Sequence, residues 1–87
     1  MGMANPLPET NEHSWLPLVK NPDEKSQIRA YCYAPTEKVL KITFQQGRTY
    51  VYWIVPESIY AMFNEAESKG KFFHEHIRTA FDYQRVD

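Results

Sequence analysis

Three short runs of strand-forming residues, separated only by turn residues, limit the centre of this chain to an antiparallel sheet. Each run is rich in β-branched and aromatic side chains, and the runs span 28–34, 39–44 and 49–54. Because parallel strands need a crossover of about a dozen or more residues, these runs must pair in antiparallel order. The sequence therefore predicts a three-stranded antiparallel β-meander.

The second hairpin has two possible registers, and a slip of one residue moves every side chain to the other face. A two-residue turn pairs Phe44 with Thr49. A three-residue loop with a left-handed Gly47 pairs Phe44 with Arg48 instead. We expect the second register because it gathers a larger apolar set on one face, namely Leu40, Ile42, Tyr50 and Tyr52.

A helical pattern follows the strands. Pro56 suits a first helical position, and apolar residues then recur at i, i+3, i+4 and i+7, namely Ile59, Met62, Phe63 and Ala66. Gly70 suits the position just after a helix end. The pattern predicts an amphipathic helix over 56–69 that buries Phe63 in the core.

Further apolar residues between Phe73 and Phe81 predict a second, shorter helix, and residues 83–86 suit a last extended segment. The expected fold is therefore α+β: a three-stranded antiparallel β-meander packed by one amphipathic helix and followed by a second short helix.

Residues 1–24 differ from the rest of the chain in charge and proline content. They carry one lysine, four carboxylates and four prolines, whereas residues 25–81 carry eight basic and five acidic side chains. We expect an extended or disordered acidic leader over 1–24 and a single domain over 25–87. The apolar stretch 15–19 docks either on this domain or on a partner, and we expect its own domain because exposed apolar clusters are uncommon on monomers.

Length and composition exclude several classes of protein. The 87 residues suffice for one small domain, and the longest apolar run is far shorter than the roughly 20 residues of a membrane span. The N-terminus lacks the basic and apolar regions of a secretory signal. A single cysteine, Cys32, excludes an internal disulfide and suits a reducing compartment. We predict a soluble, cytoplasmic protein that does not enter membranes.

A particular order of motifs runs from Ser26 to Phe81. It comprises Ile28, Tyr33, Leu40 and Phe44 in the first two strands, then Tyr50-Val51-Tyr52, Val55-Pro56, Tyr60, Ala66, Ser68 to Phe73, and Ile77-Arg78. This order resembles the KTSC domain, a module named for the C-terminus of certain lysyl-tRNA synthetases. Two features depart from the family pattern: His74 stands where relatives often carry Asn, and residues 1–24 have no counterpart.

The resemblance implies the α+β fold described above, and it implies a function only through the family's setting. The family has no agreed activity. Its presence on a tRNA-charging enzyme suggests RNA binding, and many members stand alone in bacteria and phages.

The sheet face opposite the expected helix is the first candidate site. We expect it to carry aromatic rings beside cations, namely Arg29, Tyr31, Tyr33, Lys41, Val51 and Trp53. Proteins that bind single-stranded RNA stack bases on such open faces. The alternative is that the second helix, the leader or another subunit covers this surface.

The segment Lys69-Gly70-Lys71, together with Arg78, is the second candidate site. Its cations and a helix N-terminus could contact a phosphate. The alternative is an ordinary helix end with solubilising lysines. The segment lacks the GxxxxGK[ST] spacing of a P-loop, so nucleotide hydrolysis is not predicted.

No metal or catalytic arrangement is predicted. His74 and His76 are two residues apart, so on a helix their imidazoles point to nearly opposite sides, and Cys32 has no partner cysteine. We therefore predict no metal, no cofactor, no small-molecule substrate and no enzymatic activity.

The expected function is that of a small non-catalytic binding module for RNA. Its candidate binding residues are Arg29, Tyr31, Tyr33, Lys41, Trp53, Lys69, Lys71 and Arg78, and its motif and core residues are Tyr50, Tyr52, Phe63 and Gly70. The alternative is a protein-interaction module, either a homodimer or an adaptor or small inhibitor of phage type, that uses the aromatic sheet face. The basic body favours RNA, whereas the overall net charge of −1 favours a protein partner.

Overall fold

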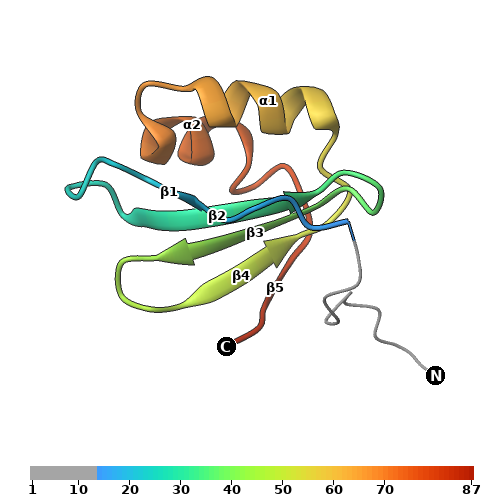
Figure 1. Ribbon diagram of the computed structural model, residues 1–87, viewed down its shortest axis with the longest axis horizontal. Coiled ribbons are helices and arrows are strands. Elements are labelled where there is room, and N and C mark those ends of the chain that lie inside the picture. Colours follow the sequence, from blue (N-terminus) through green and yellow to red (C-terminus); the bar gives the residue numbers. More distant parts are fainter. Residues whose placement is uncertain (1–13) are drawn as a thin grey trace.

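A computed structural model describes residues 14–87 as one antiparallel sheet with two helices on one of its faces (Figure 1). The sheet has five strands in chain order, namely β1 (Val19–Lys20), β2 (Ile28–Ala34), β3 (Val39–Phe44), β4 (Thr49–Tyr52) and β5 (Tyr83–Arg85). The helices α1 (Glu57–Glu65) and α2 (Lys69–His76) lie between β4 and β5 in the chain. The architecture is α+β, as expected.

The predicted three-stranded meander is wrong because a further strand lies at each edge of the sheet. Val19 of β1 pairs with Tyr31, and Tyr83 of β5 pairs with Tyr52, so β1 extends β2 and β5 extends β4. Strands of two or three residues are too short to show a period of two, so their pairing comes from tertiary contacts alone. Residues 1–13 of the expected leader lie outside the described residues, and the division after residue 24 stays a prediction.

The expected register of the β3–β4 hairpin is confirmed. The N–H of Phe44 donates to the carbonyl of Arg48 at 2.8 Å, and Gly47 has a φ of +96°. A left-handed backbone conformation at this place in a three-residue loop costs little free energy only for glycine. Ile42 therefore lies opposite Tyr50, and Leu40 opposite Tyr52, on the face that carries the helices.

The expected placement of Tyr31 and Tyr33 on the open face is wrong. In the β2–β3 pair, Tyr31 lies opposite Ile42 and Tyr33 opposite Leu40, and directly opposite residues share a face. A bulge next to Arg29 also brings Ile28 and Tyr31 to the same side. Both tyrosine rings are consequently buried under the helices, with 1% and 0% of their surface exposed.

Two helices follow the strands, as expected, but their boundary differs: α1 ends at Glu65 and not at residue 69, and the second helix, α2, begins at Lys69. Ala66 is extended and ends α1, and the hydroxyl of Ser68 accepts the N–H of Lys71 at 3.2 Å, which begins α2. Gly70 is thus in the first turn of α2 and not after a helix end. A Cβ at residue 70 would lie 3.3 Å from the Ser26 hydroxyl oxygen, so glycine permits this close approach to the segment before β2.

Aromatic contacts join the helices to the sheet. Phe63 of α1 is fully buried, as predicted, and its ring meets Tyr31 edge-on at 4.7 Å. Tyr60 stacks on Tyr33 at 4.4 Å. Phe73 of α2 contacts Phe44 at 5.4 Å. The core therefore lies between both helices and the strands β2 to β4.

The opposite face of the sheet, which we call the second face, has its own small apolar cluster. Ala34, Val39 and Val51 are buried there beneath the half-buried rings of Trp15 and Trp53. The Lys41 ammonium lies 4.8 Å from the centre of the Trp15 ring, a cation–π geometry. Trp15 thus docks on its own domain, as expected.

Within residues 14–87, neither helix has the length and apolar content needed to cross a membrane.

Replacing Phe63 by Ala should lower the free energy of unfolding by about 3–5 kcal/mol, because it leaves a cavity against Tyr31. Met62→Ala is the matched control, since Met62 is the neighbouring residue of α1 and is 53% exposed. It should change stability by less than about 0.5 kcal/mol. Urea denaturation of both variants gives the comparison, and equal effects would contradict the assigned core.

The buried tyrosines should make the fold sensitive to alkali. Burial, with a smaller contribution from Tyr60, raises the pKa of Tyr31 to about 12. A raised folded pKa stabilises the protein below the unfolded value of about 10, and this stability is lost as pH rises towards the folded value. We expect the free energy of unfolding to fall between about pH 10 and pH 12, less steeply in Tyr31→Phe. Denaturation at several pH values measures both slopes, and identical slopes would contradict this role of Tyr31.

Candidate functional site

A groove of about 700 Å³ opens at the β4–β5 side of the helix-bearing face. Small-molecule sites commonly enclose about 300–1,000 Å³. We call it the tyrosine groove, and it is lined by Gln27, Phe44, Gln46, Arg48, Tyr50, Tyr52, Phe73, Arg78, Thr79, Phe81, Asp82 and Tyr83.

The groove lies where the helices stop covering the sheet. Phe73 of α2 packs on Tyr52 at 5.5 Å, whereas the nearest rings to Tyr50 all come from the strands. After α2 the chain runs down to β5 at the edge of the sheet (Figure 1). It brings Arg78 and Phe81 along one side of the groove and Tyr83 to its outer wall.

Three tyrosine rings form a continuous aromatic surface in the groove. Tyr50 and Tyr52 alternate along β4, so both point to the same face, and Tyr83 lies across from Tyr52 on β5. The Tyr83 ring is 5.7 Å from Tyr50 and 5.8 Å from Tyr52, and 59% of Tyr83 is exposed. Tyr50 is half-buried, so two of the three rings meet solvent.

Positive charge flanks these rings. Arg48 at the hairpin and Arg78 after α2 both line the groove and are exposed. Burial, followed by the neighbouring tyrosines Tyr50 and Tyr83, raises the pKa of Tyr52, while Arg78 acts in the opposite direction. The Tyr52 hydroxyl therefore stays protonated at neutral pH and remains able to donate a hydrogen bond.

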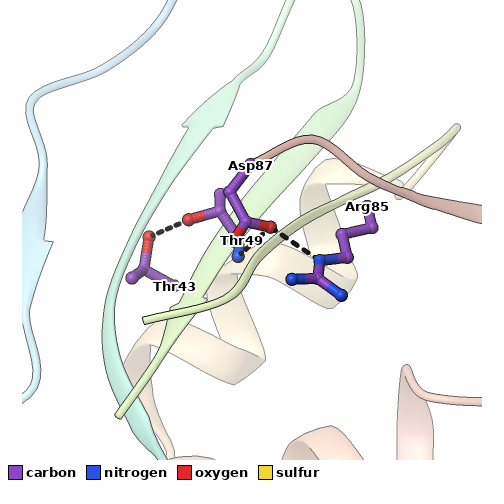
Figure 2. A network of polar contacts seen from close by, with 4 residues as sticks. All are labelled: Thr43, Thr49, Arg85 and Asp87. Carbon is purple, nitrogen blue, oxygen red and sulfur yellow. Dashed lines mark hydrogen bonds and ion pairs between the residues drawn. The ribbon is translucent and has the colours of Figure 1, made fainter. Parts of the chain in front are cut away.

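A chain of polar contacts joins β3 and β4 to Asp87 (Figure 2). The carboxylate of Asp87 accepts from the Thr49 N–H at 3.2 Å and from Nε of Arg85 at 3.0 Å. The hydroxyls of Thr49 and Thr43 are 3.1 Å apart. Hydrogen bonds from Arg85 and Thr49 lower the pKa of Asp87, so its carboxyl stays ionised at neutral and mildly acidic pH.

The residues predicted for the open sheet face do not form one surface. Lys41 and Trp53 lie on the second face, where Trp15 packs over them and their neighbours. Arg29 lies near the start of β2, outside that cluster, and donates from Nη2 to the Gln45 carbonyl at 3.3 Å. Since Tyr31 and Tyr33 are in the core and Val51 is buried on the second face, the six residues divide among three environments.

The predicted phosphate site around α2 is also divided. Lys69 donates from Nζ to the Ala66 carbonyl at 2.8 Å, and Lys71 is exposed in the first turn of the helix. Arg78 follows the other end of α2 and is the only residue of this set in the tyrosine groove. Gly70 serves the contact with Ser26 described above.

Metal-binding side chains do not gather in the part of the chain that the structure describes, where no three His, Cys, Asp or Glu residues lie together. Cys32 is buried on the second face, and this burial raises the pKa of its thiol, partly opposed by Lys41.

Two groove residues, Arg48 and Tyr83, were missing from the sequence-based candidates. Tyr83 is aromatic like Tyr50 and Tyr52. It joins them only through the pairing of β5 with β4, which the sequence did not predict. Arg48 faces the groove because it lies opposite Phe44 in the expected hairpin register, so that register was a signal for it.

Comparison with known proteins agrees with this architecture. The family model of the KTSC domain matches residues 24–81. The crystal structure of a KTSC domain protein from Yersinia pestis superposes with a TM-score of 0.70 at 35% identity, covering 82% of this chain and all of that one. A protein of Tsukamurella paurometabola is 37% identical over 60 residues, which are 69% of this chain and 90% of that protein.

Longer relatives share the same region. A lysine–tRNA ligase of Nostoc sp. is 39% identical over 70 residues, which are 80% of this chain but 12% of the ligase. This chain therefore resembles a small part of that enzyme. Within its motif Tyr50-Val51-Tyr52, the two tyrosines line the tyrosine groove, whereas Val51 is buried on the second face. The chain belongs to the KTSC domain family.

Proposed function

We propose that the tyrosine groove binds single-stranded RNA and that the domain acts by binding without catalysis. One observation carries this proposal: the exposed Tyr83 and the half-buried Tyr50 line one groove together with two exposed arginines, Arg48 and Arg78. Bases need a flat apolar surface and phosphates need fixed cations, and this groove offers both side by side.

Stacking and charge would act together on such a ligand. A base stacked on an aromatic side chain contributes about 1–3 kcal/mol, with little dependence on its identity. Arginine suits the adjoining phosphates because its planar group donates several hydrogen bonds at once. The protonated hydroxyl of Tyr52 adds a further donor near Arg78.

The geometry favours a single strand over a duplex. The tyrosine rings lie in a groove, and the bases of a duplex present their edges and not their faces. Only unstacked bases expose the faces that a tyrosine ring contacts.

The groups that line the groove suit binding more than bond breaking. They are chiefly phenols, guanidiniums, amides and apolar rings, and Asp82 is the carboxylate among the described lining residues. The similarity to part of a lysine–tRNA ligase supports an RNA ligand, since that enzyme is named for a reaction on tRNA.

The alternative, a protein partner, was based on an aromatic sheet face whose residues are not exposed together in the structure. Tyr31 and Tyr33 face the helices, Val51 is fully buried, and Trp53 packs in the cluster with Trp15. These side chains do not form one exposed surface, so we favour RNA as the ligand of the domain.

The parent chain should bind a fluorescein-labelled single-stranded oligouridylate at low salt, measured by fluorescence anisotropy. Tyr83→Ala removes the exposed stacking surface and should weaken binding by about 1–3 kcal/mol. Tyr83→Phe keeps the ring and should bind nearly as the parent does. A parent chain that does not bind at low salt would remove the proposal, as would equal affinities for Tyr83→Ala and Tyr83→Phe.

Replacing Arg48 and Arg78 together by Ala should weaken binding and also flatten its salt dependence. For a single strand, each phosphate that the protein no longer neutralises reduces the slope of log affinity against log salt by about 0.7. The double variant Lys20→Ala, Lys71→Ala is the matched control, because both lysines are exposed and neither lines the groove. Titrations at several salt concentrations decide the matter: equal slopes in the two double variants would place the phosphates elsewhere.

A further inference from the structure

A third arginine, Arg85, lies across from the groove residue Tyr50, although it is not itself among the residues that line the groove. Arg85 is directly opposite Tyr50 in the β4–β5 pair, so its side chain leaves the sheet on the groove face. Opposite residues in antiparallel strands have Cβ atoms about 4.5–5.5 Å apart. The Arg85 side chain is half exposed, so its guanidinium remains available to a ligand in the groove.

Asp87 holds this arginine to the neighbouring strand. Its carboxylate oxygen Oδ1 accepts from Nε of Arg85 and from the backbone N–H of Thr49, which opens β4 (Figure 2). The adjacent Val86 N–H donates to the Thr49 carbonyl at 2.9 Å. One carboxylate oxygen thus ties a flexible side chain of β5 to a fixed point on β4.

The contact uses only one of the arginine's five N–H donors. The four hydrogens on the two Nη atoms stay free for a phosphate, while the rotations of the side chain are already restricted. Ordering a free arginine on binding costs entropy, and an arginine held beforehand avoids part of that cost.

We propose that Asp87 is a positioning residue that holds Arg85 as a third phosphate-binding cation of the tyrosine groove. The inference rests on the proposed function, since it assigns Arg85 and Asp87 to the binding of the same single-stranded RNA. It makes the acidic side chain a contributor to the binding of a polyanion.

This role predicts a change in RNA affinity opposite to the one expected from charge alone. Removing a carboxylate beside a phosphate site normally strengthens the binding of a polyanion, because it removes a repulsion. If Asp87 holds Arg85 in place, Asp87→Asn should weaken binding instead. Asp82→Asn is the comparison for charge alone, because it removes an identical charge from an exposed residue that lines the groove and precedes the same strand.

The experiment measures the affinity of the labelled oligouridylate for the full chain at several salt concentrations. We expect Asp87→Asn to weaken binding by roughly two- to tenfold and to lower the salt slope by about 0.7, the change for one phosphate that is no longer neutralised. Asp82→Asn should bind as tightly as the parent or more tightly. Asp87→Glu keeps a carboxylate and should recover most of the affinity.

A double-mutant cycle distinguishes a loss of the Arg85 position from a general loosening of β5. If Asp87 acts through Arg85, then Asp87→Asn should have no effect once Arg85→Ala is present. An equal loss of affinity in both backgrounds would overturn the inference, and so would an Asp87→Asn variant that binds as tightly as Asp82→Asn. In either case the RNA-binding proposal would stand, whereas a parent chain without affinity for the oligouridylate would remove both.

Discussion

The register of the three central strands is the constraint on which the rest of this molecule depends. The left-handed Gly47 places Tyr50 and Tyr52 beside Ile42 and Leu40, and the bulge next to Arg29 aligns Ile28 with Tyr31. A shift of one residue in either hairpin would exchange the two faces of the strand concerned. The helices would then meet polar side chains, and Phe63 and Tyr60 could no longer pack on the tyrosine rings of β2.

That register buries some aromatic side chains in the core and leaves others exposed to solvent. The tyrosines of β2 are covered by α1, so their rings are buried and their hydroxyls are paired, Tyr31 with Asn64 and Tyr33 with the Val55 carbonyl. The tyrosines of β4 lie beyond the reach of α1, and only Tyr52 is covered, by Phe73 of α2. Tyrosines on β2 and β4, on the same face of the sheet, therefore differ in role because the helical layer is narrower than the sheet.

The two edge strands, β1 and β5, are short, but the segments that contain them add side chains to both faces of the sheet. The segment before β1 brings Trp15 over Lys41 and the buried Val51, which closes the second face. At the other edge, β5 brings Tyr83 to the tyrosine groove, and backbone hydrogen bonds with β4 and the Asp87 carboxylate hold the strand there. Each edge strand thus acts chiefly by placing particular side chains on one face of the sheet.

Local chemistry in the sequence was enough to determine the three central strands, the β3–β4 register, the burial of Phe63 and the family resemblance. Alternation, a glycine turn and the helical stripe act over a few residues, so each leaves a readable pattern. The faces of Tyr31 and Tyr33, the boundary between α1 and α2, and the pairing of β1 and β5 were decided by tertiary structure. Their causes are contacts between distant residues, such as Gly70 with Ser26 and Tyr83 with Tyr52, whose energy no local pattern records. The tyrosine groove is therefore a product of topology: Arg48, Tyr50, Arg78 and Tyr83 come together only when β5 returns to pair with β4.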